Sequence, residues 1–467
     1  MTGAFKRDIL NAPVLTVRNF LLFLLVASVF LTAFYVRQAV SSQLAYIDLP
    51  FYIAIMLLMA KYHGKLNLVG TLLWTVLAAL FLIIELSSGT GFAATVKFFF
   101  LYCAPVLVCQ VVFGFNTDEG RAFAGTIVKA VNVFTLLVFF ILLMDMLTGS
   151  AVMRFLTTRL FNELAPWVPS SVFQRHPSIW GHYLMTAGYY LAFFYLNVAY
   201  ARVTNSWLLD QRLIYVVATV GIISTGGKTV FVIYLVSLIW LNLTGRHGVR
   251  NAIALTTFLL LLYWMGLFDI VLERFGATDL SSGRNDAVDA VFSVELPQLF
   301  WGYGEGFSSY MAAKVSAFTV EIFSEYSLLS LAFKFGVVFV VLMVVLMLRA
   351  PVMAACCSGK WSLAFMGVLL VFYFSTFNAF YGIPDSYLLC SLYAIVVSML
   401  GGFREEKSSR ERPRSAKRRD PPRNKPQLEP CIDVSLQSRR SQEGFTRVKH
   451  SAGTIVARPS VGSHGKR

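Results

Sequence analysis

Long apolar runs alternate with short polar segments along the first four fifths of the chain. Runs of about 17 to 25 apolar residues can cross a bilayer as helices. We therefore predict twelve membrane-spanning helices, at 19–36, 45–61, 66–86, 92–115, 122–148, 178–200, 213–225, 229–244, 252–270, 326–348, 361–379 and 384–402. The runs 213–225 and 229–244 are short, so the insert between them is predicted as a tight turn or as a break in a re-entrant segment.

The composition favours the same fold class. Apolar residues make up 57% of the chain and charged residues 14%, and the mean hydropathy is +0.65, values outside the range of soluble domains. Membrane β-barrels use alternating segments of about ten residues, whereas these runs are continuous. The prediction is an all-α, polytopic membrane helix bundle with a large outer loop.

Basic residues collect in every second predicted connection, which places those connections in the cytoplasm. The first helix follows Lys6, Arg7 and Arg18 and has full length, so we expect it to be retained rather than cleaved as a signal. Both termini are then cytoplasmic, and two long connections, 149–177 and 271–325, lie outside. The inner connections carry Lys61, Lys65, Arg121, Arg202, Arg212, Arg246, Arg250, Arg349 and Lys360.

Most of the net charge of +15 belongs to the C-terminal segment. Residues 404–467 contain 17 Lys and Arg against 7 Asp and Glu, are rich in Arg, Pro and Ser, and have almost no aromatic residues. Such a composition cannot bury enough apolar surface to fold alone. We predict a membrane domain at 1–403 and a disordered cytoplasmic tail at 404–467. The tail is expected to contact anionic lipids, at about 1 kcal/mol per basic residue near the surface, rather than nucleic acid.

The sequence predicts neither disulfides nor a metal or cofactor. None of the six cysteines lies in a connection predicted to be outside, and Cys356 and Cys357 lack the partners of a zinc site. His176 and His182 would not share a helical face. The glycines at 302, 304 and 306 follow no predicted strand, so they do not form a dinucleotide fingerprint.

Three charged residues stand out within the predicted spans: Glu85, Lys97 and Asp145. An ionisable group in lipid is costly unless it is paired or faces water, which makes each a functional candidate. Glu85 and Lys97 lie near the outer ends of neighbouring spans and are expected to pair or to reach the interface. Asp145 is close to the outer end of its span and is expected to face a cavity or the interface.

The polar, glycine-punctuated segment 281–307 is unusual in so apolar a chain, and long loops with a pattern of their own are often functional. The outer regions also carry cations against the positive-inside bias. That bias is statistical, but together these cations suit an anionic headgroup or a pyrophosphate, which Arg binds through its rigid donor fork. They are Arg154, Arg159, Arg175, Lys228, Arg274, Arg284 and Lys314.

Three segments, in this order, resemble the O-antigen ligase and polymerase family, the Wzy/ExoQ type of bacterial polysaccharide enzyme. His176-Pro177-Ser178 to Leu184 is similar to the family's HPN-x-x-G-x-Y-L entry into a span. The segment STGGKT at 224–229 looks like its serine-rich turn, which ends in Arg-Thr. Ser282-Gly283-Arg284 followed by 302–307, GYGEGF, resembles its SGR...GxGxGxF signature. The resemblance covers roughly residues 90 to 350.

Two departures from the family pattern affect the choice between activities. Ser324 stands where the ligases have a histidine, and Lys228 replaces the arginine of the serine-rich turn. Both favour a repeat-unit polymerase of an exopolysaccharide or capsule over an O-antigen ligase. The main alternative function is that of a flippase or transporter for lipid-linked oligosaccharides, and a third candidate function is that of a non-enzymatic scaffold.

The resemblance implies an inner-membrane glycosyltransferase whose donor is an undecaprenyl-pyrophosphate-linked oligosaccharide. An acceptor hydroxyl would attack the anomeric carbon of the donor in one inverting displacement, with no cofactor. Flippase and chain-length regulator proteins are candidate partners. The reaction needs cations on the leaving pyrophosphate and a base for the attacking hydroxyl.

For the leaving group we predict Arg284 and Lys228, with Arg175 and Arg274 in reserve. An ion pair of Arg284 with Asp286 or Asp289 is the structural alternative.

The base is predicted to be Glu325, Glu321 or His176. The two glutamates are four residues apart and would share a face of a helix that began there. Their alternative role is charge complementarity at a helix N-terminus.

Gly302 and Gly304 are predicted to form a tight turn beside substrate. Tyr303 is predicted to bind substrate, and Trp301, Tyr303 and Phe307 either stack on sugars or belong to the membrane interface.

Overall fold

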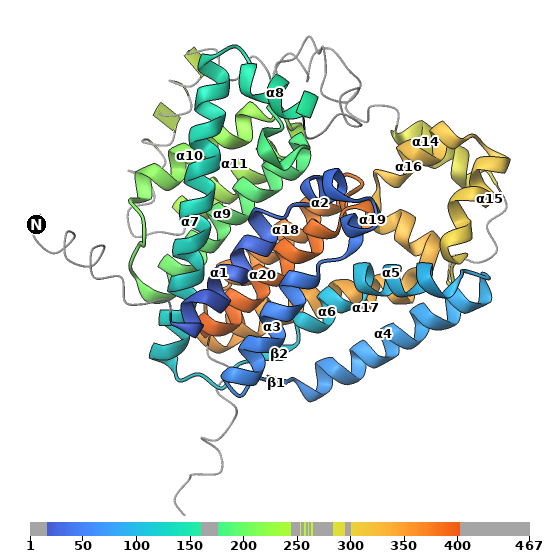
Figure 1. Ribbon diagram of the computed structural model, residues 1–467, viewed down its shortest axis with the longest axis horizontal. Coiled ribbons are helices and arrows are strands. Elements are labelled where there is room, and N and C mark those ends of the chain that lie inside the picture. The colour runs from blue at the N-terminus through green and yellow to red at the C-terminus, as the bar shows by residue number, and fades with distance from the viewer. Residues whose placement is uncertain are drawn as a thin grey trace, which may run out of the picture. The chain divides into compact units, whose positions relative to one another are not determined.

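The computed structural model describes residues 16–159, 176–243, 284–294 and 300–401, with a few positions between 253 and 264 (Figure 1). The chain divides into two units, Met1–Glu405 and Glu406–Arg467, and the second lies outside the described residues. So do Arg175, Arg274, most of the predicted span 252–270 and the whole of the predicted tail.

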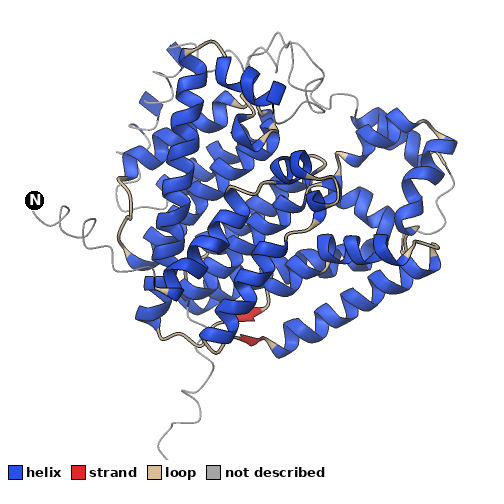
Figure 2. Cartoon of the chain, in the orientation of Figure 1, coloured by secondary structure: helices blue, strands red, loops and turns tan. Residues whose placement is uncertain are grey.

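Helices make up nearly all of the regular structure (Figure 2). The first half contains α1 (Val17–Phe30), α2 (Phe34–Val40), α3 (Leu49–Lys61), α4 (Leu68–Ser87), α5 (Phe92–Tyr102), α6 (Ala104–Val108), α7 (Thr117–Leu147), α8 (Ala151–Arg159), α9 (Tyr183–Thr204) and α10 (Gln211–Ser224). The second contains α11 (Lys228–Leu243), α14 (Arg284–Phe292), α15 (Phe307–Lys314), α16 (Ala317–Ser324), α17 (Ser327–Ser358), α18 (Ser362–Ser375), α19 (Ala379–Gly382) and α20 (Pro384–Gly401).

Three short 3-10 turns and one small strand pair complete the described structure. The turns are η1 (Leu44–Tyr46), η3 (Ser178–Trp180) and η4 (Gly304–Gly306). Strands β1 (Lys65–Leu66) and β2 (Val111–Val112) pair antiparallel, with Lys65 opposite Val112. The predicted all-α fold class is confirmed for the described chain.

Helix starts follow the local sequence. Asn116 caps α7, because its side chain accepts a hydrogen bond from the backbone N–H of Glu119 at 2.8 Å, and Asp118 and Glu119 lie in the positive first turn. Asn67 caps α4 in the same way through the N–H of Gly70 at 3.0 Å. Polar residues between the apolar runs therefore fix where the spans begin.

The chain has the long apolar helices of a multi-pass membrane protein. Within the described residues, five helices are long and apolar enough to cross a bilayer: 44–61, α4, α7, α17 and α20. A sixth is added if α1 and α2, bent by 83°, count as one span. The predicted run 92–115 is divided into α5 and α6, and α10, α11 and α18 have only 14 to 16 residues. At 1.5 Å per residue these helices are shorter than the bilayer core.

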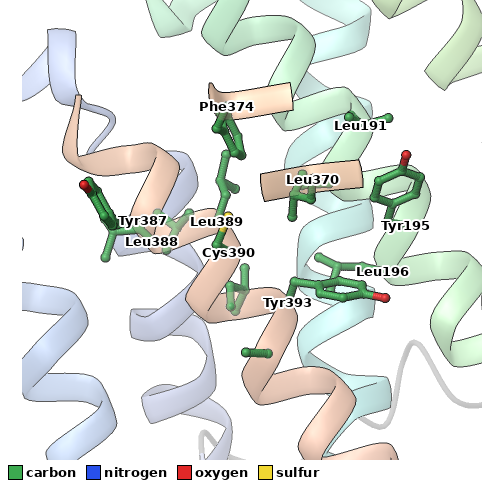
Figure 3. Close-up of a cluster of buried hydrophobic side chains, with 14 of the residues drawn as sticks. Leu191, Tyr195, Leu196, Leu370, Phe374, Tyr387, Leu388, Leu389, Cys390 and Tyr393 are labelled. Atoms are coloured by element: carbon green, nitrogen blue, oxygen red, sulfur yellow. The ribbon is translucent and has the colours of Figure 1, made fainter. Parts of the chain in front are cut away.

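Helix α20 lies at the centre of the bundle, where 94% of its span is buried. It packs against α7, α9, α17 and α18. Figure 3 shows Leu389, Cys390 and Tyr393 on the side of α20 that faces side chains of α9 and α18, with Tyr387 on the other side. Buried tyrosines donate to backbone oxygens there: Tyr387 to Phe380 at 2.8 Å and Tyr393 to Leu363 at 2.8 Å. A helix that is apolar all round fits this central position.

Predicted inner connections contact one another at one end of the helices, which we call the basic end. Lys360 Nζ donates to the carbonyl of Arg202 at 2.5 Å, and Arg202 donates to that of Leu241 at 2.7 Å. Arg349 contacts Gln110 at 3.4 Å. Helices α9 and α17 run from this end to the other, which we call the motif end because it holds the sequence motifs.

Candidate functional site

Asp145 and His176 form a buried pair at the motif end. Asp145 lies in the last turn of α7, and its Oδ2 is 2.9 Å from Nδ1 of His176. Its Oδ1 accepts a hydrogen bond from the backbone N–H of Met153 at 2.8 Å. Gly149 and Ser150, both with positive φ, turn the chain so that Met153 returns to Asp145. Both side chains are under a tenth exposed, so the carboxylate holds the imidazole in one orientation.

The same histidine joins two of the sequence motifs. The backbone N–H of His176 donates to the carbonyl of Ser224 at 3.1 Å, and Ser224 is the last residue of α10. The STGGKT segment turns there, with Gly226 at φ +62°, and Lys228 begins α11 half-buried. Segments 48 residues apart in sequence thus meet, and residues 225–227 form a turn between α10 and α11, as both predicted alternatives require.

His182 has a separate, structural role. Its ring accepts a hydrogen bond from the N–H of Met185 at 3.4 Å, capping α9, and stacks on Tyr35 at 5.5 Å. Within the described ranges, no group of three or more His, Cys, Asp and Glu is arranged to hold a metal ion.

Arg284 and Glu325, both predicted site residues, form an ion pair. Oε2 of Glu325 lies 2.5 Å from Nη2 and Nε of Arg284. Their side chains are 23% and 40% exposed, so the pair is open to solvent. Tyr326 supports it by donating to Asn285 at 3.2 Å. The alternative pairing of Arg284 with Asp286 or Asp289 is not found.

The two glutamates lie within and directly after helix α16. Helix α16 begins at Ala317 and ends at Ser324, so Glu321 lies within the helix while Glu325 lies in the link to α17. Glu321 is exposed, away from the pair. The expectation of one shared face assumed a helix that begins at these residues, whereas α16 begins at Ala317 and ends just before Glu325.

Gly302 and Gly304 are required by close backbone packing. Helix α17 is broken at Gly336, whose φ of 83° and ψ of 154° are open only to glycine. The loop at 300–303 docks on this break: the N–H of Tyr303 donates to the carbonyl of Phe333 at 2.9 Å. A Cβ at Gly302 would lie 2.6 Å from the nitrogen of Gly336, and one at Gly304 would lie 2.6 Å from Ser88.

The three aromatic residues of this loop differ in environment. Phe307 is buried and stacks on Phe333 at 5.4 Å, so it is not placed to contact a sugar. Tyr303 is half-buried and stacks on Tyr310 at 5.3 Å. Trp301 is 60% exposed and fits either the interface or a glycan.

A buried lysine at the break escaped the sequence analysis. Lys334 makes an ion pair with Glu305 of η4, and its side chain is 3% exposed. Its Nζ is 3.4 Å from the hydroxyl of Tyr102 and lies over the rings of Phe98 and Tyr381 at 4.9 Å. A lysine inside the run 326–348 was the signal that could have identified it.

The expected pairing of Glu85 with Lys97 was wrong. Glu85 is fully buried, and neither carboxylate oxygen makes a well-formed hydrogen bond. Its charged neighbours are Glu305 and Lys334. Lys97 instead lies 3.8 Å above the ring of Tyr46, in a cation–π contact.

A second charged cluster also escaped the sequence analysis. Arg37 Nη2 is 2.7 Å from Asp48 and 2.7 Å from Asp385, and all three side chains are buried. Asp385 also accepts from the N–H of Phe34 at 2.6 Å and from the hydroxyl of Tyr189 at 3.0 Å. The cluster satisfies backbone groups exposed where α1 bends into α2.

The link at 376–378 lies between the two parts of the predicted site. The hydroxyl of Ser327, two residues after Glu325, donates to the carbonyl of Phe377. The ring of Phe377 stacks on that of His182 at 6.4 Å. Near this link, burial raises the pKa of Tyr381, so its hydroxyl stays neutral as it bonds to Ser308. Ser327 and His182, which lie near Glu325 and His176 in the sequence, thus contact the same link.

Compared with protein-family models, curated proteins and solved structures, the chain shows no match. The family resemblance therefore rests on the three motif segments alone.

Proposed function

We propose that the protein is a membrane glycosyltransferase that joins polyprenyl-pyrophosphate-linked repeat units of an exopolysaccharide or capsule at the outer face of the inner membrane. The observation that carries the proposal is the Asp145–His176 pair held against Ser224. Two of the resemblance motifs supply its parts, and a carboxylate that orients an imidazole is a recurring arrangement for a general base.

His176 is the base in this proposal. A bond from Nδ1–H to Asp145 leaves Nε2 to accept a proton. The acceptor hydroxyl loses that proton to Nε2 as its oxygen bonds to the anomeric carbon of the donor. The bond from that carbon to the pyrophosphate breaks at the same time, and the electron pair leaves with the phosphate. Asp145 stabilises the imidazolium that forms.

Arg284 and Lys228 would bind the leaving pyrophosphate. The Arg284 guanidinium already binds an oxyanion, the carboxylate of Glu325, in a pair that is 23% and 40% exposed. A phosphate could take the place of that carboxylate, because Arg binds both through the same donor fork. Glu325 is then the resting partner of Arg284 rather than the base. Among the three candidates for the base, this favours His176.

The proposed topology keeps twelve spans with both termini in the cytoplasm. The directions of α10 and α11 support this topology. Helix α10 begins near Arg212 and ends at Ser224 beside His176, at the motif end, and α11 begins there at Lys228 and runs back toward the basic end. In this topology the basic end faces the cytoplasm, and the tail at 404–467 contacts anionic lipid.

The product pattern of a deletion strain that expresses single variants tests the function. Arg284→Ala should accumulate single lipid-linked repeats at the outer face. Asp289→Asn, a change at an exposed position of the same helix α14, should give normal polymer. Normal polymer from well-expressed Arg284→Ala would refute the site. Unattached polymer in the deletion strain would indicate a ligase instead.

Lys228 is tested by two substitutions that separate charge from size. Lys228→Arg keeps the cation and should retain polymer formation, whereas Lys228→Gln should lose it, if the ammonium acts on pyrophosphate. Equal activity of the two variants would remove Lys228 from the site.

A lipid-linked oligosaccharide flippase is the second candidate, favoured by the broken helices. The 83° bend between α1 and α2 and the break in α17 at Gly336 each adjoin buried charges, as in transporters. A flippase predicts repeats trapped at the inner face of the deletion strain, whereas a polymerase predicts single repeats outside.

A further inference from the structure

One buried carboxylate, one partly exposed carboxylate and one buried ammonium lie at the break in α17. Lys334 of α17 pairs with Glu305 of η4, and Glu85 of α4 lies beside them. Glu85 is 0% exposed and neither of its oxygens makes a well-formed hydrogen bond. Glu305 is 21% exposed and Lys334 is 3% exposed. A carboxylate buried in this way is costly as an anion unless something neutralises it.

The elements packed against α4 supply no paired cation for Glu85. These elements are α5, α6, α17 and η4. Helix α5 brings Lys97, which lies over Tyr46, and Tyr102, which contacts Lys334. Helix α6, of sequence APVLV, has no titratable group. Helix α17 brings Lys334 and η4 brings Glu305, with Tyr381 of α19 beside that lysine.

The ion pair between Lys334 and Glu305 leaves the negative charge of an ionised Glu85 without an ion-pair partner. No ion pair involving Glu85 occurs in the part of the chain that the structure describes. The remaining polar neighbours, the side chain of Thr90 and the backbone of Glu305, are neutral. A single positive charge, small enough to enter a fully buried position, would complete the neutralisation.

We propose that Glu85, Glu305 and Lys334 form a proton-binding site that holds one proton, shared between the two carboxylates. With the proton on Glu85, the acid can donate a hydrogen bond and Lys334 keeps Glu305 as its partner. The number of bound protons is a property of the whole cluster rather than of one residue, because interacting carboxyl groups titrate together. The site does not depend on the reaction proposed above.

Three substitutions change the proton count in a defined way. Glu85→Gln and Glu305→Gln each leave one carboxylate for one ammonium, so either variant should hold no proton. Lys334→Gln leaves two carboxylates without a cation, so it should hold two. Lys97→Met is the matched control. Lys97 is an electrostatic neighbour of Lys334, but it lies over the ring of Tyr46 and forms no ion pair with Glu85 or Glu305 in the described part of the chain, so this variant should leave the count at one.

Infrared spectra of the purified full chain in detergent report this count at neutral pH. The carbonyl band of a protonated carboxylic acid should be present in the wild type and in Lys97→Met, lost on Glu85→Gln or Glu305→Gln, and stronger in folded Lys334→Gln. A band that survives either glutamine substitution unchanged would overturn the proposal. A band that rises on Lys97→Met would also do so, because Lys97 would then be the counterion of Glu85.

Thermal unfolding gives an independent measure. An unfolded glutamate loses its proton above about pH 4.3, while the folded cluster keeps one. The folded state then binds more protons, so its unfolding temperature should fall as pH rises, relative to that of Glu85→Gln. Parallel curves for the two proteins would contradict the proposal. An increase in unfolding temperature with Na⁺ at fixed pH, absent in Glu85→Gln, would assign the site to a metal cation and overturn the proton.

Discussion

Gly302 and Gly336 approach so closely that a Cβ on Gly302 would lie 2.6 Å from the backbone nitrogen of Gly336. Both have positive φ, of 80° and 83°. The contact seats the loop carrying Glu305 on the break of α17, beside Lys334. A glycine pair thus positions a charged residue from a loop against one within a membrane span.

Gly302→Ala and Gly336→Ala should each destabilise the protein. A strained φ costs about 1–3 kcal/mol, and the added methyl group also meets fixed backbone atoms. The measurement is the thermal unfolding midpoint in detergent. Gly306→Ala is the matched control, since a Cβ there meets nothing within 4 Å, and its midpoint should stay at the wild-type value. A normal midpoint for Gly302→Ala would mean that the loop is not seated on the break.

Replacing Arg37 should be among the most destabilising single changes. Arg37→Met leaves Asp48 and Asp385 buried without their shared cation, and breaking a buried ion pair costs about 3–5 kcal/mol. Arg121→Met provides the comparison, because Arg121 and Asp118 are 42% and 96% exposed and 3.8 Å apart, a pair worth less than about 1 kcal/mol. Similar unfolding midpoints for the two variants would argue against an ionised cluster.

The residues that the sequence could identify are those whose pattern is local. Apolar runs predicted the helices, and the Ser224–Lys228 insert predicted the turn between α10 and α11. The number of spans was not recoverable in this way. The run 92–115 would be equally apolar as one continuous helix. In the structure it is divided at Cys103 into α5 and α6, and Pro105 lies in the first turn of α6.

Partners of charged residues depended on contacts distant in sequence. Asp145 and Arg284 were identified as candidates, but the sequence could not show their direct contacts with His176, 31 residues away, and Glu325, 41 residues away. Lys334 could be seen within its apolar run, but its partner could be identified only from the structure, where Glu305 pairs with it at the break of α17 at Gly336.

The ion pair of Arg284 with Glu325 should matter for activity more than for stability. Because both side chains are partly exposed, Glu325→Gln should change the free energy of unfolding by less than about 1 kcal/mol. If a pyrophosphate displaces Glu325, this variant frees Arg284 and should still form polymer, whereas Arg284→Gln should not. Loss of polymer in well-folded Glu325→Gln would restore Glu325 as a candidate base.

Asp145→Asn is the sharpest test of the proposed base. An amide at this position can accept from the N–H of Met153 but cannot stabilise an imidazolium, so polymer formation should fall by about 10²–10⁴-fold. His176→Ala should fall at least as far, and the double variant little further, because the two act as a unit. Asp118→Asn, at the other end of α7 and 96% exposed, is the control. The rate of polymer formation in membranes and the folded fraction in detergent are measured together. Additive losses in the double variant, or a normal rate for Asp145→Asn, would show that the pair serves the fold and not the reaction.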